Sequence, residues 1–315
     1  MATISQNLLL LSSVKTGKEA RPLMLSILYG MEDTMRSVES IGATLSETFP
    51  VAMENYNAAV GVAIDAMDLM GLTSYISSSA YLSNSELTSF EGSNITKIFR
   101  SAFAYCPNLS QISFPLCRFI GDGAFGACSM LSSVHAPILA STGQAAFQEC
   151  TSLSSFDMGS IEIIGSGCFY RCSALESVNA PAATSVGGNA FAGCVSLSLI
   201  SVPKLQTIDQ YAFANCAALP SISLPAASVI SYYAFSSCMS LSVVDLTGTS
   251  QPPVVNQFTF SGTPITNSSY LGYFGSIWIP EGMMSAFLLT SGWSYYSERL
   301  TEVEEIDDPG WEGWG

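Results

Sequence analysis

Residues 164–181 read IGSGCFYRCSALESVNAP. Residues 186–203 repeat this frame, reading VGGNAFAGCVSLSLISVP. Phe169, Cys172 and Leu175 of the first stretch therefore recur 22 positions later in the second. A unit that repeats at a fixed period of this length is the mark of a solenoid, because one turn cannot bury its own apolar face and stacked turns can.

The period runs through seven copies without an insertion. Its aromatic and thiol columns predict a structural ladder inside the solenoid, made of Phe103, Phe125, Phe147, Phe169, Phe191, Phe213, Phe235, Cys106, Cys128, Cys150, Cys172, Cys194, Cys216 and Cys238. A weaker copy begins at Ile76. After an insertion at Pro252–Pro253, a copy displaced by three residues contains Thr259, Phe260 and Thr263.

Each repeat divides into two halves. The Leu-x-x-Val-x-x-Pro half, residues 175–181 in the opening stretch, predicts a strand whose residues point alternately inward and outward, and proline ends the pairing. The Ala-Phe-x-x-Cys half has no extended period and predicts a short helical turn. The predicted fold class is therefore an α/β solenoid.

The frame Ile-Gly-x-x-Ala-Phe-x-x-Cys-x-x-Leu-x-x-Ile-x-x-Pro resembles the BspA-like, or Treponema-type, leucine-rich repeat. The end of the chain is similar to the closing segment of that family, with a strand over Ser276–Pro280, a helix near Met284–Phe287, and Gly292–Ser294. The resemblance implies a leucine-rich repeat of 22-residue coils. It also implies a surface or secreted adhesin that binds host or microbial partners.

Four regions follow from the pattern. Apolar stripes at helical spacing, such as Met31, Met35 and Val38, predict a helical attachment or capping segment over residues 1–75. Residues 76–247 form the solenoid of about eight coils, and residues 248–308 form an irregular last coil and a C-terminal cap. Residues 309–315 are predicted to be a flexible tail.

Charge and hydropathy exclude several classes of protein. The net charge is −15 and only 11% of residues are charged, so we expect no nucleic-acid binding. No segment reaches the roughly 20 apolar residues of a membrane-spanning helix, so we expect no membrane insertion. The apolar run at Leu8–Leu11 lacks the flanks of a signal peptide. These features predict synthesis in the cytoplasm and a final location on a virion or cell surface.

The nine cysteines and the single histidine leave several interpretations open. All nine thiols occupy columns where other copies hold small or apolar residues, which favours buried free thiols. Disulfides between coils, a metal site and a cysteine nucleophile are the alternatives. We expect no catalytic residues, because His135, the only candidate base for a thiol, lies in a different column. We expect no metal, because Cys168 and Cys172 form the only short-spaced Cys/His set. We also expect no cofactor.

Short polar residues decorate the outward positions of the strand half. The candidate ligand-binding residues on this exposed strand face are Gln111, Ser113, His135, Asp157, Ser177, Asn179, Ser201 and Asp245. Tyr211, Tyr232 and Tyr233 are candidate aromatic contacts. A merely solvated sheet face, and aromatic stacking between coils, are the structural alternatives.

These observations favour a non-enzymatic binding or adhesion protein that recognises a cell-surface protein or glycan through the solenoid. The opening Met-Ala-Thr-Ile-Ser-Gln-Asn-Leu resembles the start of small structural proteins of phages and prophages. That resemblance implies a receptor-binding virion component attached to other virion proteins through residues 1–75. The alternative is a bacterial BspA-like surface adhesin without a virion, and self-association through residues 1–75 is also open.

Overall fold

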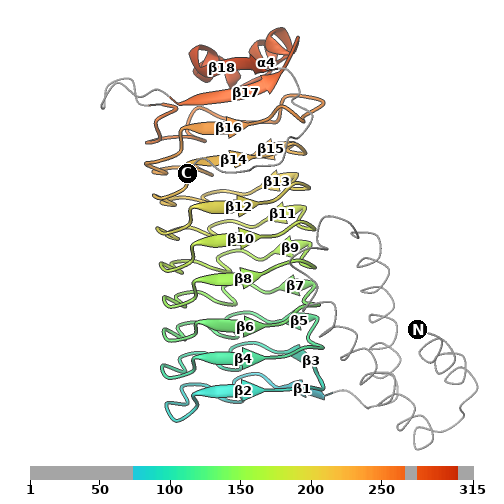
Figure 1. Ribbon diagram of the computed structural model, residues 1–315, viewed down its shortest axis with the longest axis vertical. Helices are drawn as coiled ribbons and strands as arrows, with labels where there is room; N and C mark the ends of the chain where they lie inside the picture. The colour runs from blue at the N-terminus through green and yellow to red at the C-terminus, as the bar shows by residue number, and fades with distance from the viewer. Residues whose placement is uncertain (1–73, 267–274, 304–315) are drawn as a thin grey trace, which may run out of the picture. The chain divides into compact units, whose positions relative to one another are not determined.

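The computed structural model describes residues 74–266 and 275–303. The chain divides into two units, Met1–Ser74 and Tyr75–Gly315. The helices predicted within residues 1–75 and the tail predicted at 309–315 lie outside the described residues. The described part is a solenoid of stacked turns, which Figure 1 shows as a column of parallel strands.

The Leu-x-x-Val-x-x-Pro half of each repeat forms a strand, as the alternation predicts. These strands pair in parallel with the strands of neighbouring turns and form three sheets along one face, in the orders β2-β4-β6, β12-β10-β8 and β14-β16-β17-β18. Their bounds are β2 Ser89–Glu91, β4 Gln111–Ser113, β6 Ser133–His135, β8 Ser155–Asp157, β10 Ser177–Asn179, β12 Leu199–Ser201, β14 Ser221–Ser223 and β16 Val243–Asp245.

A second strand in each turn was missed by the sequence analysis. It includes the buried residue that stands five positions before the Phe column, which is Ile or Val in most turns and Thr142 in one, and eight such strands form one continuous parallel sheet. The strands are β1 Ser74–Ile76, β3 Ile95–Ile98, β5 Phe119–Ile120, β7 Ser141–Thr142, β9 Ile163–Ile164, β11 Ser185–Val186, β13 Thr207–Ile208 and β15 Val229–Ile230. Two strands in every turn make the solenoid a β-solenoid.

The Ala-Phe-x-x-Cys half is a series of tight turns, so the predicted short helical turn was wrong. Around Phe147, both Ala145 and Glu149 are left-handed, with φ values of 56° and 59°. The N–H groups of all three residues donate to carbonyls of the next turn at 2.8 Å. A helix needs an unbroken run of right-handed residues. The left-handed residues interrupt that run here, so only single-turn hydrogen bonds remain within the segment, such as the one from the Gln148 N–H to the Ala145 carbonyl at 3.1 Å.

The ladder residues fill the interior between the sheets and the turns. All seven Phe and all seven Cys side chains are fully buried. Each Phe ring stacks on those of the adjacent turns, as Phe169 does on Phe147 and Phe191, with centroids 5.5 and 5.4 Å apart. The displaced copy continues the stack, because Phe260 lies 5.6 Å from Phe235 at an angle of 13°.

The C-terminal segment closes this stack. The strand β17 (Ser276–Pro280) pairs with β16 and with β18 (Leu300–Val303), and α4 (Met284–Leu289) and η1 (Trp293–Arg299) lie between them in sequence. Tyr296 of η1 packs edge-on against Phe260, with centroids 5.2 Å apart. The Trp293 Nε1 donates to the Pro253 carbonyl at 2.8 Å, so the cap is attached to the insertion that precedes it.

Candidate functional site

The exposed strand face consists of two columns of short side chains in strict register. Ser177 lies beside Ser155 and Leu199, and Asn179 lies beside Asp157 and Ser201. Within the candidate set, the exposed residues are Gln111, His135, Asp157, Asn179 and Ser201, and the half-buried ones are Ser113, Ser177 and Asp245. Parallel pairing repeats these side chains at roughly 4.8 Å, which gives a ligand a regular row of polar groups.

Both carboxylates of the candidate set, Asp157 and Asp245, also have a structural role that the sequence did not reveal. The Asp157 Oδ1 accepts a hydrogen bond from the Gly159 N–H at 3.0 Å. The Asp245 Oδ1 accepts from the Thr247 N–H at 2.9 Å and from its hydroxyl at 2.7 Å, and Ser223 donates to the other oxygen at 2.8 Å. Asp245 therefore holds the corner after β16, and fewer of its lone pairs remain for a ligand.

The three candidate tyrosines gather with a fourth ring in one aromatic cluster, which we define as Tyr211, Tyr232, Tyr233 and Phe258. Tyr233 stacks on Tyr211 at 5.1 Å and contacts Tyr232 edge-on at 4.4 Å. Phe258 lies 5.1 Å from Tyr232 and 5.3 Å from Tyr233. Stacking between coils therefore does occur, while Tyr232 keeps 39% of its surface exposed.

Phe258 was missed because it follows the insertion at Pro252–Pro253. The signal was nevertheless present: Phe258 precedes Phe260 by two residues, as Tyr233 precedes Phe235. The three-residue displacement hid this equivalence, which places an aromatic residue at the same position in three successive turns.

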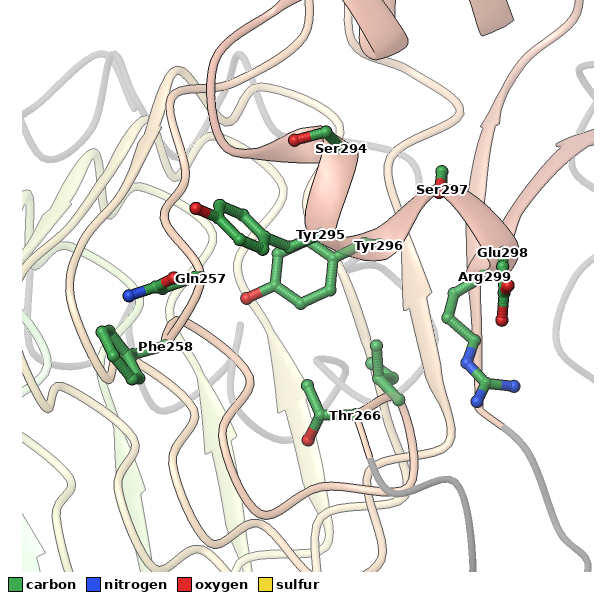
Figure 2. A pocket seen from close by; sticks show the side chains of 10 residues that line it. Gln257, Phe258, Thr266, Ser294, Tyr295, Tyr296, Ser297, Glu298 and Arg299 are labelled. Carbon is green, nitrogen blue, oxygen red and sulfur yellow. The ribbon is translucent and has the colours of Figure 1, made fainter.

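A pocket of about 510 Å³ lies between the last turn and the cap. Figure 2 shows Tyr295 and Tyr296 of η1 on one wall, facing Gln257 and Phe258. The Tyr296 hydroxyl donates to the Asn256 carbonyl at 2.7 Å, and burial raises the pKa of Tyr296 to about 12. This tyrosine is therefore a neutral structural group at physiological pH.

The nine thiols are free and buried. Each ladder thiol donates to the carbonyl of the residue 25 positions earlier, as Cys172 does to Phe147 at 3.1 Å and Cys194 to Phe169 at 3.1 Å. Desolvation raises the pKa of Cys194 to about 12, and it raises that of Cys172 well above its ordinary value. A cysteine nucleophile needs an accessible thiolate, so these thiols are suited to packing and hydrogen bonding.

Among residues 74–266 and 275–303, no group of three or more His, Cys, Asp or Glu side chains is placed to hold a metal ion. In the same ranges, no helix is both long and apolar enough to cross a membrane.

We expect the native chain to resist thiol alkylation. Iodoacetamide should modify none of the nine cysteines of the folded protein within about an hour, and all nine after unfolding in urea, because only an exposed thiolate reacts quickly. Mass spectrometry of the intact chain counts the adducts. Rapid modification of any ladder thiol in the folded protein would mean that the column is open to solvent.

The parallel two-strand turn of 22 residues defines the class of this molecule as a leucine-rich repeat solenoid. The chain matches the family model described as "BspA type Leucine rich repeat region", with six copies over residues 74–197 and 162–277. It belongs to this family. Solenoids of this kind typically serve as non-enzymatic binding scaffolds.

Solved structures with a similar arrangement come from several bacteria. A leucine-rich repeat protein of Treponema pallidum is 22% identical, with 50% of this chain and 69% of that chain covered and a TM-score of 0.38. A leucine-rich cell surface protein of Faecalibacterium prausnitzii is 20% identical, with 68% and 72% covered and a TM-score of 0.37. A leucine-rich repeat protein of Eubacterium ventriosum is 21% identical, with 60% and 46% covered and a TM-score of 0.42. No curated protein matches the chain.

Proposed function

We propose that the chain is a non-catalytic adhesion protein that recognises a protein or glycan on a cell surface through its exposed strand face. The observation that carries this proposal is the register of that face. Asp157, Asn179 and Ser201 stand side by side on paired strands and are all exposed. The scaffold beneath them is ordered before a ligand binds, because β10 pairs with both β8 and β12 and the stacked Phe column lies in the interior.

The interior supports a binding role rather than chemistry. Within the described residues, every buried side-chain nitrogen and oxygen has a hydrogen-bond partner. The nine thiols are buried, and burial raises the pKa of Cys172 and of Cys194 above the ordinary value of a thiol. The groups available to a ligand are therefore those on the outer surface. Attachment of residues 1–75 to a virion, or to another assembly, stays a prediction from the sequence.

A double substitution tests the proposal. The fluorescently labelled full chain is titrated onto a panel of epithelial and bacterial cells and measured by flow cytometry. We expect saturable binding by the wild type and at least about tenfold weaker binding by Ser177→Ala/Asn179→Ala, because central interface residues commonly contribute this much. Both side chains lie on the outer face, so the melting temperature should hardly change.

The matched control is Ser185→Ala, which changes a serine of the same turn on the neighbouring eight-stranded sheet. It should bind as the wild type does. Wild-type binding by the double variant would contradict a role for the strand face.

A further inference from the structure

A shallow groove runs along the solenoid beside the turns, away from the candidate strand-face residues. It consists of two adjoining pockets of about 650 and 350 Å³ that share Ser166 and Gly188. We call it the side groove. The volume of each pocket falls in the range of small-molecule and cofactor sites, about 300–1,000 Å³. None of the strand-face candidates lines it.

The side groove exists because one column of the repeat changes size from turn to turn. Three residues before each Phe the chain has Gln144, Ser166, Gly188, Gln210 and Tyr232 in successive turns. The two small residues in the middle leave a depression, and the larger side chains on either side wall it. The depression therefore spans neighbouring turns.

Asn256, one of the polar residues that line the groove, accepts a hydrogen bond from the Phe258 N–H at 2.9 Å, whereas four others leave their polar atoms available to a ligand. Among the described residues, the side chains of Gln148, Asn189, Asp209 and Gln210 make no hydrogen bond or ion pair. Amides both donate and accept, and a carboxylate accepts from up to four directions. Such a set matches a ligand rich in hydroxyl groups, each of which is a donor and an acceptor at once.

Each of the two pockets of the side groove is lined by a tyrosine. Tyr170 lines one pocket and Tyr232 lines the other. Tyr232 is held in place by Tyr233 and Phe258, with centroids 4.4 and 5.1 Å away. A ring that is fixed before binding loses little entropy when it packs against a ligand, and it offers an apolar surface beside the amides.

The backbone beside the groove argues against an extended peptide as the ligand. The N–H groups of Ala145, Gly167 and Asn189 each donate to a carbonyl of the next turn, at 2.8, 2.8 and 3.0 Å. Tyr211 does the same at 3.2 Å. A peptide that adds a strand needs a sheet edge with unpaired backbone groups, and these positions provide none.

Charge restricts the ligand further. Among the described residues that line the two pockets, Asp209 carries a charge and no Lys or Arg is present. An anionic sugar would meet the Asp209 carboxylate. Arg171, whose guanidinium lies 5.1 Å from the centre of the Tyr170 ring, is paired with Glu149 at 3.8 Å.

From the chemistry of this lining we infer that the side groove is a second binding site, which takes an uncharged oligosaccharide. Its hydroxyl groups pair with Asp209 and with the amides of Asn189 and Gln210, and a sugar face packs on Tyr232. This site does not depend on the strand face, so either site can fail alone.

A glycan array tests the inference. The labelled full chain is applied to neutral, sialylated and sulfated oligosaccharides, and neutral hits are titrated by calorimetry. We expect at least one neutral hit, whose affinity falls at least about tenfold in Tyr232→Ala and in Asp209→Ala. Tyr232→Phe keeps the ring and should bind within about threefold of the wild type. Circular dichroism confirms that the variants are folded.

Two matched controls locate the effect. Tyr105→Ala removes a tyrosine that is 63% exposed on another turn, and Ser177→Ala/Asn179→Ala alters the strand face; both should leave the neutral hit unchanged. Three results would overturn the inference that the side groove binds an uncharged oligosaccharide. These are no neutral hit, binding of charged glycans only, and full affinity in Tyr232→Ala and Asp209→Ala. Loss of glycan binding only in Ser177→Ala/Asn179→Ala would also overturn this inference, and it would support the strand face as the glycan-binding surface.

Discussion

Replacing Phe169 with alanine should lower the free energy of unfolding by about 3–5 kcal/mol, the cost of deleting a buried aromatic ring from a core. Phe169 is fully buried and lies between two stacked rings, and Phe156 packs edge-on against it at 5.4 Å. Removing it breaks the column in the middle, where turns on both sides depend on it. Urea denaturation followed by circular dichroism measures the change.

The matched control for this experiment is Ile163→Ala, a change in a neighbouring strand whose side chain is 55% exposed. We expect it to change the free energy of unfolding by no more than about 0.5 kcal/mol. A loss below about 1 kcal/mol for Phe169→Ala would mean that the aromatic column does not carry the core.

The second large effect is expected at Gly165, where alanine should destabilise the fold by about 1–3 kcal/mol, the usual range for inserting an atom into a packed interior. A Cβ there would lie 2.5 Å from the Gly143 carbonyl oxygen and 2.7 Å from that of Thr142. Both atoms belong to the backbone of the preceding turn. The two turns would have to separate, since neither oxygen can rotate away.

Gly159→Ala is the control for this substitution, because a Cβ at Gly159 would meet only the Asp157 carboxylate oxygen, at 3.4 Å. It should be neutral or stabilising by up to about 1 kcal/mol, through a less flexible unfolded chain. Urea denaturation compares the two variants directly. Equal stability of Gly165→Ala and Gly159→Ala would show that the turns do not pack as closely as described.

The period of the sequence predicts a large part of this structure. The Phe and Cys columns are apolar at every copy, so their burial follows from the repeat alone. The outward position of Asn179 follows from alternation within the strand half, since its neighbour Val178 is buried. Stacking then places identical positions side by side, so the residues of the strand face could be predicted from the period.

The second strand of each turn, the left-handed turn residues and the side groove could not be predicted from the sequence. Strand β9 is only Ile163–Ile164, and two residues are too few to show alternation. Ala145 and Glu149 are left-handed although neither is Gly or Asn, because bonds to the next turn determine their conformation. The side groove arises because Ser166 and Gly188, two small residues 22 positions apart, lie on adjacent turns. The sequence shows their sizes, but not that the stacked turns leave a depression between them.

We expect the outer strand face of this solenoid to bind a cell-surface molecule, and an equilibrium titration on one cell type that binds the wild type measures that binding. The ratio of dissociation constants for Ser177→Ala/Asn179→Ala against the wild type, with Ser185→Ala measured in parallel, is the deciding quantity. If the strand face is the binding surface, the ratio is at least about ten for the double variant and about one for the control. A ratio near one for both would contradict this expectation.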